Sequence, residues 1–170
     1  MSERVAARMA DIAPFHVMDI LARARALEAQ GRDIIHLEIG EPDFPTPAPI
    51  VEAGVAALRA GQTHYTGALG LPELRNAIAG FYAQRWNATI NPARVIVTPG
   101  ASGALLLTLG LLAGPGDEVL LADPGYPCNR HFARFCEARA VAIPVGADTA
   151  YQLSLDLIER HASLATRAVL

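Results

Sequence analysis

Apolar residues in the first half of the chain recur every three or four positions in three separate stretches, which predicts three amphipathic helices. The first precedes Gly31, a helix-stopping residue, and its apolar face is formed by Val17, Ile20, Leu21, Ala24 and Leu27. The second runs from an N-cap and proline at Thr46-Pro47 to Gly61. The third starts at Pro72 and is expected to turn its larger apolar side chains inward: Leu71, Leu74, Ile78, Phe81 and Tyr82.

Short apolar runs predict β-strands, beginning with DIIHLEI at residues 33–39. From residue 95 onward the pattern alternates between strand and helix. The predicted strands are Val95–Thr98, Glu118–Ala122, Ala140–Val145 and Arg167–Leu170, and the predicted helices start near Ala101, near Cys128 and at Leu155, the last ending at His161. This alternation predicts an α/β fold with a mostly parallel sheet, helices on both faces and right-handed crossovers. The sequence stops within the last predicted strand, so we expect a fragment.

The composition fits a globular chain, because 52% of the 170 residues are hydrophobic and 18% are charged. The net charge of −3 predicts no basic surface for nucleic acid. The longest apolar run, residues 103–113, is shorter than the ~20 residues that cross a bilayer, and the N-terminus has no signal-peptide core. Two cysteines without a disulfide pattern fit a reducing compartment. We therefore expect a cytoplasmic protein without membrane or nucleic-acid partners.

The joint between the predicted strand at 95–98 and the next helix consists of residues with almost no side chain: Pro99, Gly100, Ala101, Ser102 and Gly103. The first N–H groups of a helix lack internal partners and the helix dipole adds partial positive charge, so a phosphate can bind there. The loop lacks the Gly-Lys-Ser/Thr of a Walker A motif and has only two of the three glycines of a Rossmann fingerprint. On these residues alone, a tight connection without a ligand is an open alternative.

Four motifs carry a resemblance to a known family. They are HLEIGEPDFPTP (residues 36–47), HYTGALGLPELR (64–75), VTPGASGAL (97–105) and DPGYP (123–127). In order and spacing they resemble the class I aminotransferases, which have the aspartate aminotransferase fold and use pyridoxal 5′-phosphate (PLP). The resemblance implies that residues 1–45 form an N-terminal arm and a small-domain segment with a helix and a strand. It implies that residues 46–170 form the N-terminal portion of the PLP-binding large domain, ending in mid-strand.

The resemblance also implies site residues. Gly100, Ala101 and Ser102 match the loop that holds the PLP phosphate, Tyr126 matches the aromatic residue that stacks on the pyridine ring, Tyr65 matches a tyrosine that reaches the cofactor phosphate of the partner subunit, and Gly40 matches a glycine beside the substrate carboxylate. A helix N-terminus suits the dianionic phosphate, and a stacked ring keeps the cofactor flat. The protein would thus orient PLP, which performs the organic chemistry.

The implied activity is transfer of an amino group between an amino acid and a 2-oxo acid by a homodimer. All 14 cationic residues are arginines, so the chain lacks the lysine that forms the Schiff base with PLP in this family. We therefore expect an N-terminal fragment that has no catalytic residue of its own and is inactive alone. Three alternatives stay open: a PLP-dependent C–S lyase of the same fold, a non-catalytic PLP-binding regulatory domain, and an intact nucleotide-binding α/β domain.

The remaining polar residues have structural explanations. We expect loop solvation or capping, and not acid–base chemistry, for the carboxylates of Glu38, Glu41 and Asp43. No metal site is expected at Cys128, His131 and Cys136, which share no single helical face and lack a fourth ligand. Structural or surface positions are expected for the other histidines, His16, His36, His64 and His161, and a solvated helix face for Arg75 and Arg85.

Overall fold

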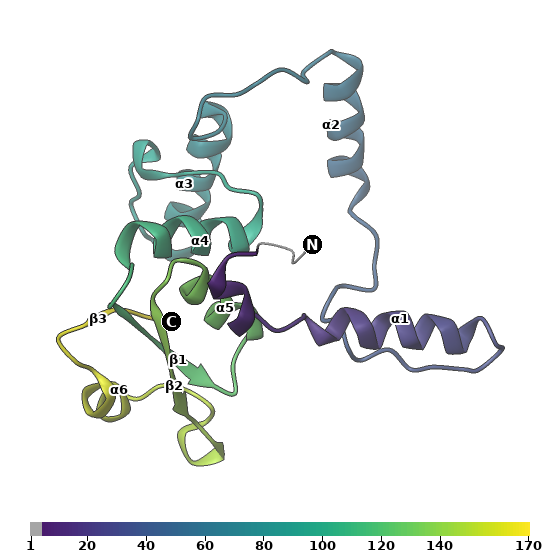
Figure 1. Ribbon diagram of the computed structural model, residues 1–170. Helices are drawn as coiled ribbons and strands as arrows, with labels where there is room; N and C mark the ends of the chain where they lie inside the picture. Colours follow the sequence, from purple (N-terminus) through teal and green to yellow (C-terminus); the bar gives the residue numbers. More distant parts are fainter. Residues whose placement is uncertain (1–4) are drawn as a thin grey trace. The chain divides into compact units, whose positions relative to one another are not determined.

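A computed structural model describes residues 5–170, and in it the chain divides into two units (Figure 1). One unit combines the N-terminal residues up to Ile39 with Gly100–Leu170, and the other is Gly40–Pro99. The boundary predicted between residues 45 and 46 separates two domains of the resembled family, and it stays a prediction. Within residues 5–170, no helix is both long enough and apolar enough to cross a membrane.

The first unit contains a parallel three-stranded sheet with the strand order β2-β1-β3. The central strand β1 (Glu118–Asp123) pairs with β2 (Arg139–Pro144) on one side and with β3 (Thr166–Val169) on the other. The first four residues of β1 are buried, as expected for a parallel strand that is covered on both faces. The structure therefore confirms the α/β class and three of the predicted strands.

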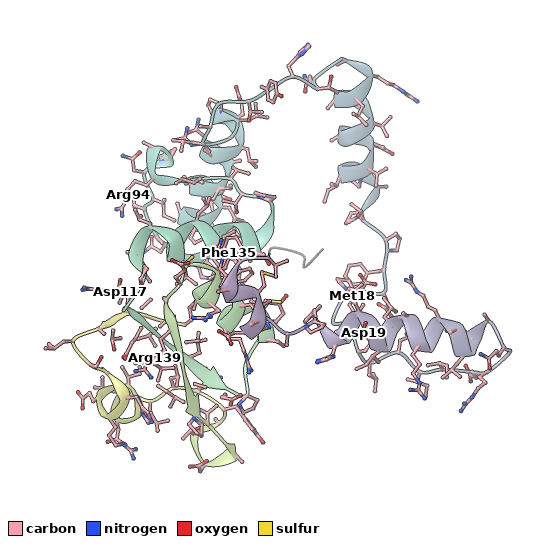
Figure 2. The ribbon with its side chains drawn as sticks, in the orientation of Figure 1. Met18, Asp19, Arg94, Asp117, Phe135 and Arg139 are labelled. Atoms are coloured by element: carbon pink, nitrogen blue, oxygen red, sulfur yellow. The ribbon has the colours of Figure 1, made fainter. Side chains whose placement is uncertain are left out.

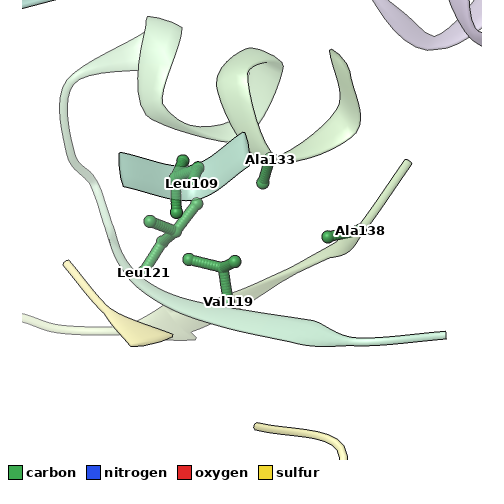
Figure 3. Close-up of a cluster of buried hydrophobic side chains, with 5 residues drawn as sticks. All are labelled: Leu109, Val119, Leu121, Ala133 and Ala138. Atoms are coloured by element: carbon green, nitrogen blue, oxygen red, sulfur yellow. The ribbon is translucent and has the colours of Figure 1, made fainter. Parts of the chain in front are cut away.

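Helices α4 (Gly100–Leu112) and α5 (Pro127–Phe135) start where the sequence predicts and pack against each other and the sheet. The core beneath them is a cluster of buried apolar side chains, formed by Leu109, Val119, Leu121, Ala133 and Ala138. Figure 3 shows Val119 and Leu121 pointing from β1 toward Leu109 and Ala133. This cluster fixes α4 on the sheet.

The other side of the sheet faces α6 (Leu155–His161), which contacts β2 and lies opposite α4 and α5 in Figure 1. Leu120 and Ile143 are fully buried and belong to this side, because successive residues of a strand point to opposite faces. The helix follows the short 3₁₀ turn η3 (Ala147–Thr149) and begins after Ser154, whose hydroxyl oxygen accepts a hydrogen bond from a first-turn N–H. Its bounds confirm the sequence prediction.

Charged side chains tie the strands together at their amino ends. The buried Glu118 carboxylate accepts hydrogen bonds from Arg139 of β2 and from the Ser163 hydroxyl, the latter at 2.8 Å. The Arg139 guanidinium, followed by the Ser163 hydroxyl, lowers the pKa of Glu118. Arg167 of β3 donates to Asp117 at 2.9 Å, and Figure 2 marks Asp117 and Arg139. These contacts join β1 to both of its neighbours.

The N-terminal part of the first unit consists of η1 (Ala7–Asp11) and α1 (His16–Glu28). The helix confirms the first predicted amphipathic stretch, although Ala24 is its one buried residue and Met18, marked in Figure 2, is half-exposed. The strand predicted at residues 33–39 is wrong: the segment has no strand partner in the described residues. Its Ile35 and Leu37 are 83% and 88% exposed, because the segment has no neighbouring strand to bury them.

The second unit contains α2 (Ala48–Arg59), α3 (Pro72–Trp86) and the 3₁₀ turn η2 (Pro92–Arg94). The N-cap of α2 is Pro47, one residue later than predicted, and no side chain caps the helix. The predicted inward face of α3 is wrong for its large residues, since Ala79 is the one buried position among the described residues of this helix. Phe81 and Tyr82 are half-exposed and pack edge-on or tilted against Trp86, with ring centroids 5.0 and 4.9 Å away.

Arg75 of α3 is a further correction within this unit. The sequence predicts a solvated side chain, but Arg75 is part-buried and its Nε donates to the carbonyl oxygens of Pro92 (3.1 Å) and Val95 (3.0 Å). The predicted strand at residues 95–98 is also wrong. Its Val97 N–H donates to the Leu69 carbonyl, a loop contact and not part of a strand ladder. Arg85, in contrast, is exposed as predicted.

Candidate functional site

The first turn of α4 presents backbone with few side-chain atoms. Gly100 is the first residue of the helix, and Gly100, Ala101 and Ser102 are all exposed. Gly100 has φ +75°, a left-handed conformation that favours glycine, and a Cβ at this position would meet no atom within 4 Å. The first turn contains no acidic residue. The helix dipole and the first-turn amides therefore favour an anion here, as the sequence predicts.

Tyr126 lies at the carboxyl end of the central strand and forms the N-cap of α5. Tyr126 is 52% exposed, so part of its ring surface is accessible to a ligand. The preceding turn requires glycine at position 125, because a Cβ there would lie 2.5 Å from the carbonyl oxygen of Ala122. The Asp123-Pro124 peptide bond within this turn is cis. The turn thus presents Tyr126 on a short, closely packed segment.

Two neighbours fix the Tyr126 side chain. The rings of Phe15 and Tyr126 form a T-shaped contact, with centroids 6.2 Å apart and an interplanar angle of 70°. At the other end, a hydrogen bond with the Cys128 thiol raises the pKa of Tyr126, with smaller contributions from the charge of Cys128 and from burial. Phe15 is a residue that sequence reasoning missed, and its position directly before α1 gives no signal of a contact with Tyr126.

A pocket of about 610 Å³ opens beside Tyr126 at the carboxyl ends of β1 and β3. Tyr126 and the polar residues Asp123, Asn129 and Arg130 belong to its wall, whereas the first turn of α4 does not. The Oδ1 atom of Asn129 is buried and has no hydrogen-bond partner among the described residues. Ligands of open parallel sheets bind beyond the carboxyl ends of the strands, so both the pocket and Tyr126 occupy an expected place.

The other two predicted site residues belong to the second unit. Gly40 is exposed, and a Cβ added to it would meet no atom within 4 Å. Tyr65 lies in the loop between α2 and α3, and its side chain is fully exposed. The structure thus brings the Gly100–Ser102 turn and Tyr126 into one unit, and Gly40 and Tyr65 into the other.

The predicted structural role of His36 takes a specific form. Its Nδ1 lies 2.6 Å from the Glu38 carboxylate and its Nε2 lies 2.9 Å from the Glu28 carboxylate. These hydrogen bonds raise the pKa of His36, the bond with Glu38 contributing most, and they join the end of α1 to the following segment.

Within residues 5–170, no three His, Cys, Asp or Glu side chains are placed to hold a metal ion, and both cysteines are free thiols.

Comparison with known proteins gives a consistent result. Residues 32–169 match the family described as aminotransferase class I and II. The chain is 47% identical to a (5-formylfuran-3-yl)methyl phosphate transaminase of Methanocaldococcus jannaschii over 79% of its residues, and 39% identical to a valine–pyruvate aminotransferase of Mycobacterium tuberculosis over 93%. These matches cover 36% and 40% of the relatives, so the chain spans about two-fifths of their length.

A solved structure supports the same relationship. The crystal structure of an aminotransferase from Mycobacterium tuberculosis superposes with a TM-score of 0.92 at 37% sequence identity. The match covers 99% of this chain and 43% of that one. The fold and the sequence therefore agree on one group of proteins.

Proposed function

The chain belongs to the class I and II aminotransferases, and on that premise we propose that the whole protein transfers an amino group between an amino acid and a 2-oxo acid. Enzymes of this family depend on PLP, and the described residues fit such a cofactor. The observation that carries the proposal is the first turn of α4, which combines exposed small residues, a serine hydroxyl and no acidic side chain. A helix N-terminus of this kind suits a phosphate ester.

The candidate residues take the following roles in this proposal. The amides of Gly100, Ala101 and Ser102, with the Ser102 hydroxyl, hold the phosphate. Tyr126 offers a half-exposed ring that lies over the pyridine ring and keeps it flat. When bound, PLP supplies an electron sink for the electron pair released at the substrate Cα. In this proposal the chain binds and orients the cofactor, and Gly40 lies beside the substrate carboxylate.

We also propose that the whole protein is a cytoplasmic homodimer in which Tyr65 serves the site of the partner subunit. Two features support this arrangement. The Tyr65 ring is fully exposed, and α2 carries a row of exposed apolar side chains formed by Ile50, Val51, Val55 and Leu58. Contiguous exposed apolar surface of this kind is typical of a protein–protein interface.

Ligand binding tests the phosphate site directly. The probe is pyridoxamine 5′-phosphate, which carries the same ring and phosphate and needs no lysine, a residue that this chain lacks. Ser102→Ala removes one hydrogen bond to a charged group, so the dissociation constant should rise about tenfold. Thr108→Ala removes an exposed hydroxyl further along the same helix and should leave the affinity unchanged. Equal affinities of the two variants would contradict the assignment of the phosphate to α4.

A reaction assay of the whole protein tests the activity. The relatives include valine–pyruvate and arginine–pyruvate aminotransferases, so pyruvate is the first acceptor to supply. With an amino acid mixture and pyruvate, the expected result is alanine together with an equal amount of a new 2-oxo acid, measured by mass spectrometry. Release of ammonia or sulfide from a sulfur amino acid without any acceptor would instead indicate a C–S lyase, and the proposed activity would be wrong.

A further inference from the structure

The segment before α1 runs along α5 and is bonded to it at several points. Arg8 donates to the Glu137 carboxylate at 3.1 Å, and its guanidinium lies 5.3 Å from the centre of the Phe135 ring, which Figure 2 marks. Asp11 forms an ion pair with Arg134 of α5. We call residues 7–15 the N-terminal strap. Its charged contacts all involve the carboxyl-terminal half of α5 or the residues just beyond it.

The strap ends at Phe15, and Phe15 meets the opposite end of α5. Tyr126 is the N-cap of that helix, and its ring forms the T-shaped contact with Phe15, with ring centroids 6.2 Å apart. The strap therefore reaches from Glu137, just after α5, to Tyr126, just before it. Exposed ion pairs contribute little stability individually. The aromatic contact is therefore the part of the strap that we expect to matter most.

We propose that Phe15 is a positioning residue that holds the ring of Tyr126 in the orientation in which it stacks on the pyridine ring of the cofactor. This inference rests on the proposed function. A tyrosine ring that is half-exposed can change its rotamer, and a hydrogen bond at its hydroxyl leaves rotation about the long axis of the ring free. The T-shaped contact with Phe15 restricts that rotation, because aromatic pairs favour some relative ring orientations over others.

A double-mutant cycle distinguishes positioning from a general contribution to folding. The variants of the full chain are Phe15→Leu, Tyr126→Leu and the two combined, with pyridoxamine 5′-phosphate as the probe. Phe15→Leu should raise its dissociation constant about two- to tenfold, the range that corresponds to one aromatic pair. In the Tyr126→Leu background the same change should have no further effect. Independent, multiplicative effects would overturn the inference.

Two further variants complete the design. Phe44→Leu removes a phenylalanine that is 69% exposed in the other unit. This variant should bind the probe with the same affinity as the unmodified chain. Phe15→Met replaces the ring with a flexible apolar side chain, so it should also raise the dissociation constant. Should Phe15→Leu fail to fold, Phe15→Met decides alone, and unchanged affinity then overturns the inference. The near-ultraviolet circular dichroism of the bound probe should decrease in Phe15→Leu but not in Phe44→Leu, because it reports how rigidly the probe is held.

The outcomes separate this inference from the proposed function. If the unmodified chain does not bind the probe, or if Tyr126→Leu leaves its affinity unchanged, the proposed site is wrong and the inference fails with it. If Tyr126→Leu weakens binding while Phe15→Leu and Phe15→Met do not, the site stands and the strap has no part in positioning the ring.

Discussion

Replacing Leu109 tests whether α4 is held on the sheet by the core cluster. Leu109 is 1% exposed and packs with Val119, Leu121 and Ala133, so Leu109→Ala removes buried apolar atoms and leaves a cavity (Figure 3). Leu→Ala removes three side-chain carbon groups, and burying each such group away from water stabilises the fold by about 0.8 kcal/mol. Their loss therefore costs about 2.4 kcal/mol. The unfilled cavity adds to this, so the total loss of unfolding free energy should be about 3–4 kcal/mol.

Leu111 of the same helix provides the matched control, because it is 83% exposed. The same substitution there deletes the same three carbon atoms from a side chain that is already in contact with solvent. Leu111→Ala should change the unfolding free energy by less than about 0.5 kcal/mol. Urea denaturation of the full chain, followed by far-ultraviolet circular dichroism, measures both. Leu109→Ala should lower the midpoint without changing the slope. Equal midpoints for the two variants would show that the cluster does not hold α4, and the position of its first turn would lose its structural basis.

Two other predictions concern His36 and the turn before Tyr126. Because Glu38 and Glu28 raise the pKa of His36 above its ordinary 6.5, the stability it provides is fully present below that value and lost as the pH rises through the higher folded pKa. Proton NMR should show this raised midpoint, and His36→Gln should remove the corresponding fall in stability with pH. Gly125→Ala forces the backbone apart and should cost about 1–3 kcal/mol, whereas Gly54→Ala, in open space within α2, should gain about 0.5–1 kcal/mol in thermal denaturation. A stabilising change at Gly125 would refute the close approach in that turn.

The helices were predictable wherever their signals are local. A serine N-cap stands directly before α6, a proline opens each of α3 and α5, and small residues open α4. Each of these signals acts within one turn of the helix that it starts, so the neighbouring sequence contains the whole cause. The start of α6 agrees with the prediction for this reason.

The strands were predictable only in part, because a strand needs a partner that the local sequence does not name. β1 and the segments at 33–39 and 95–98 all have short apolar runs. β1 has β2 and β3 on its two sides, whereas neither of the other segments has a strand neighbour among the described residues. An apolar run therefore indicates a tendency to be buried, and pairing decides whether that tendency becomes a strand.

The same reasoning explains the wrong predictions for α3. Helical spacing places Leu74, Ile78 and Phe81 near one another on one face, but burial of that face requires another element to cover it. Arg75 shows the converse, because carbonyl oxygens of a later loop, those of Pro92 and Val95, attract a side chain that periodicity assigns to solvent. Both errors come from contacts that are distant in sequence.

Tyr126 combines both kinds of information within the candidate site. Its place in the chain is locally determined, since the tight turn at Gly125 and the start of α5 at Pro127 lie on either side of it, and a sequence motif of five residues is enough to identify it. The orientation of its ring depends on Phe15, which is more than a hundred residues earlier and belongs to no recognisable motif with it. A sequence motif is therefore enough to name Tyr126 as a residue that we propose to bind the cofactor, whereas the orientation of its ring depends on long-range packing. Substitution of Phe15 should for that reason alter cofactor binding even though no strap residue lines the pocket beside Tyr126.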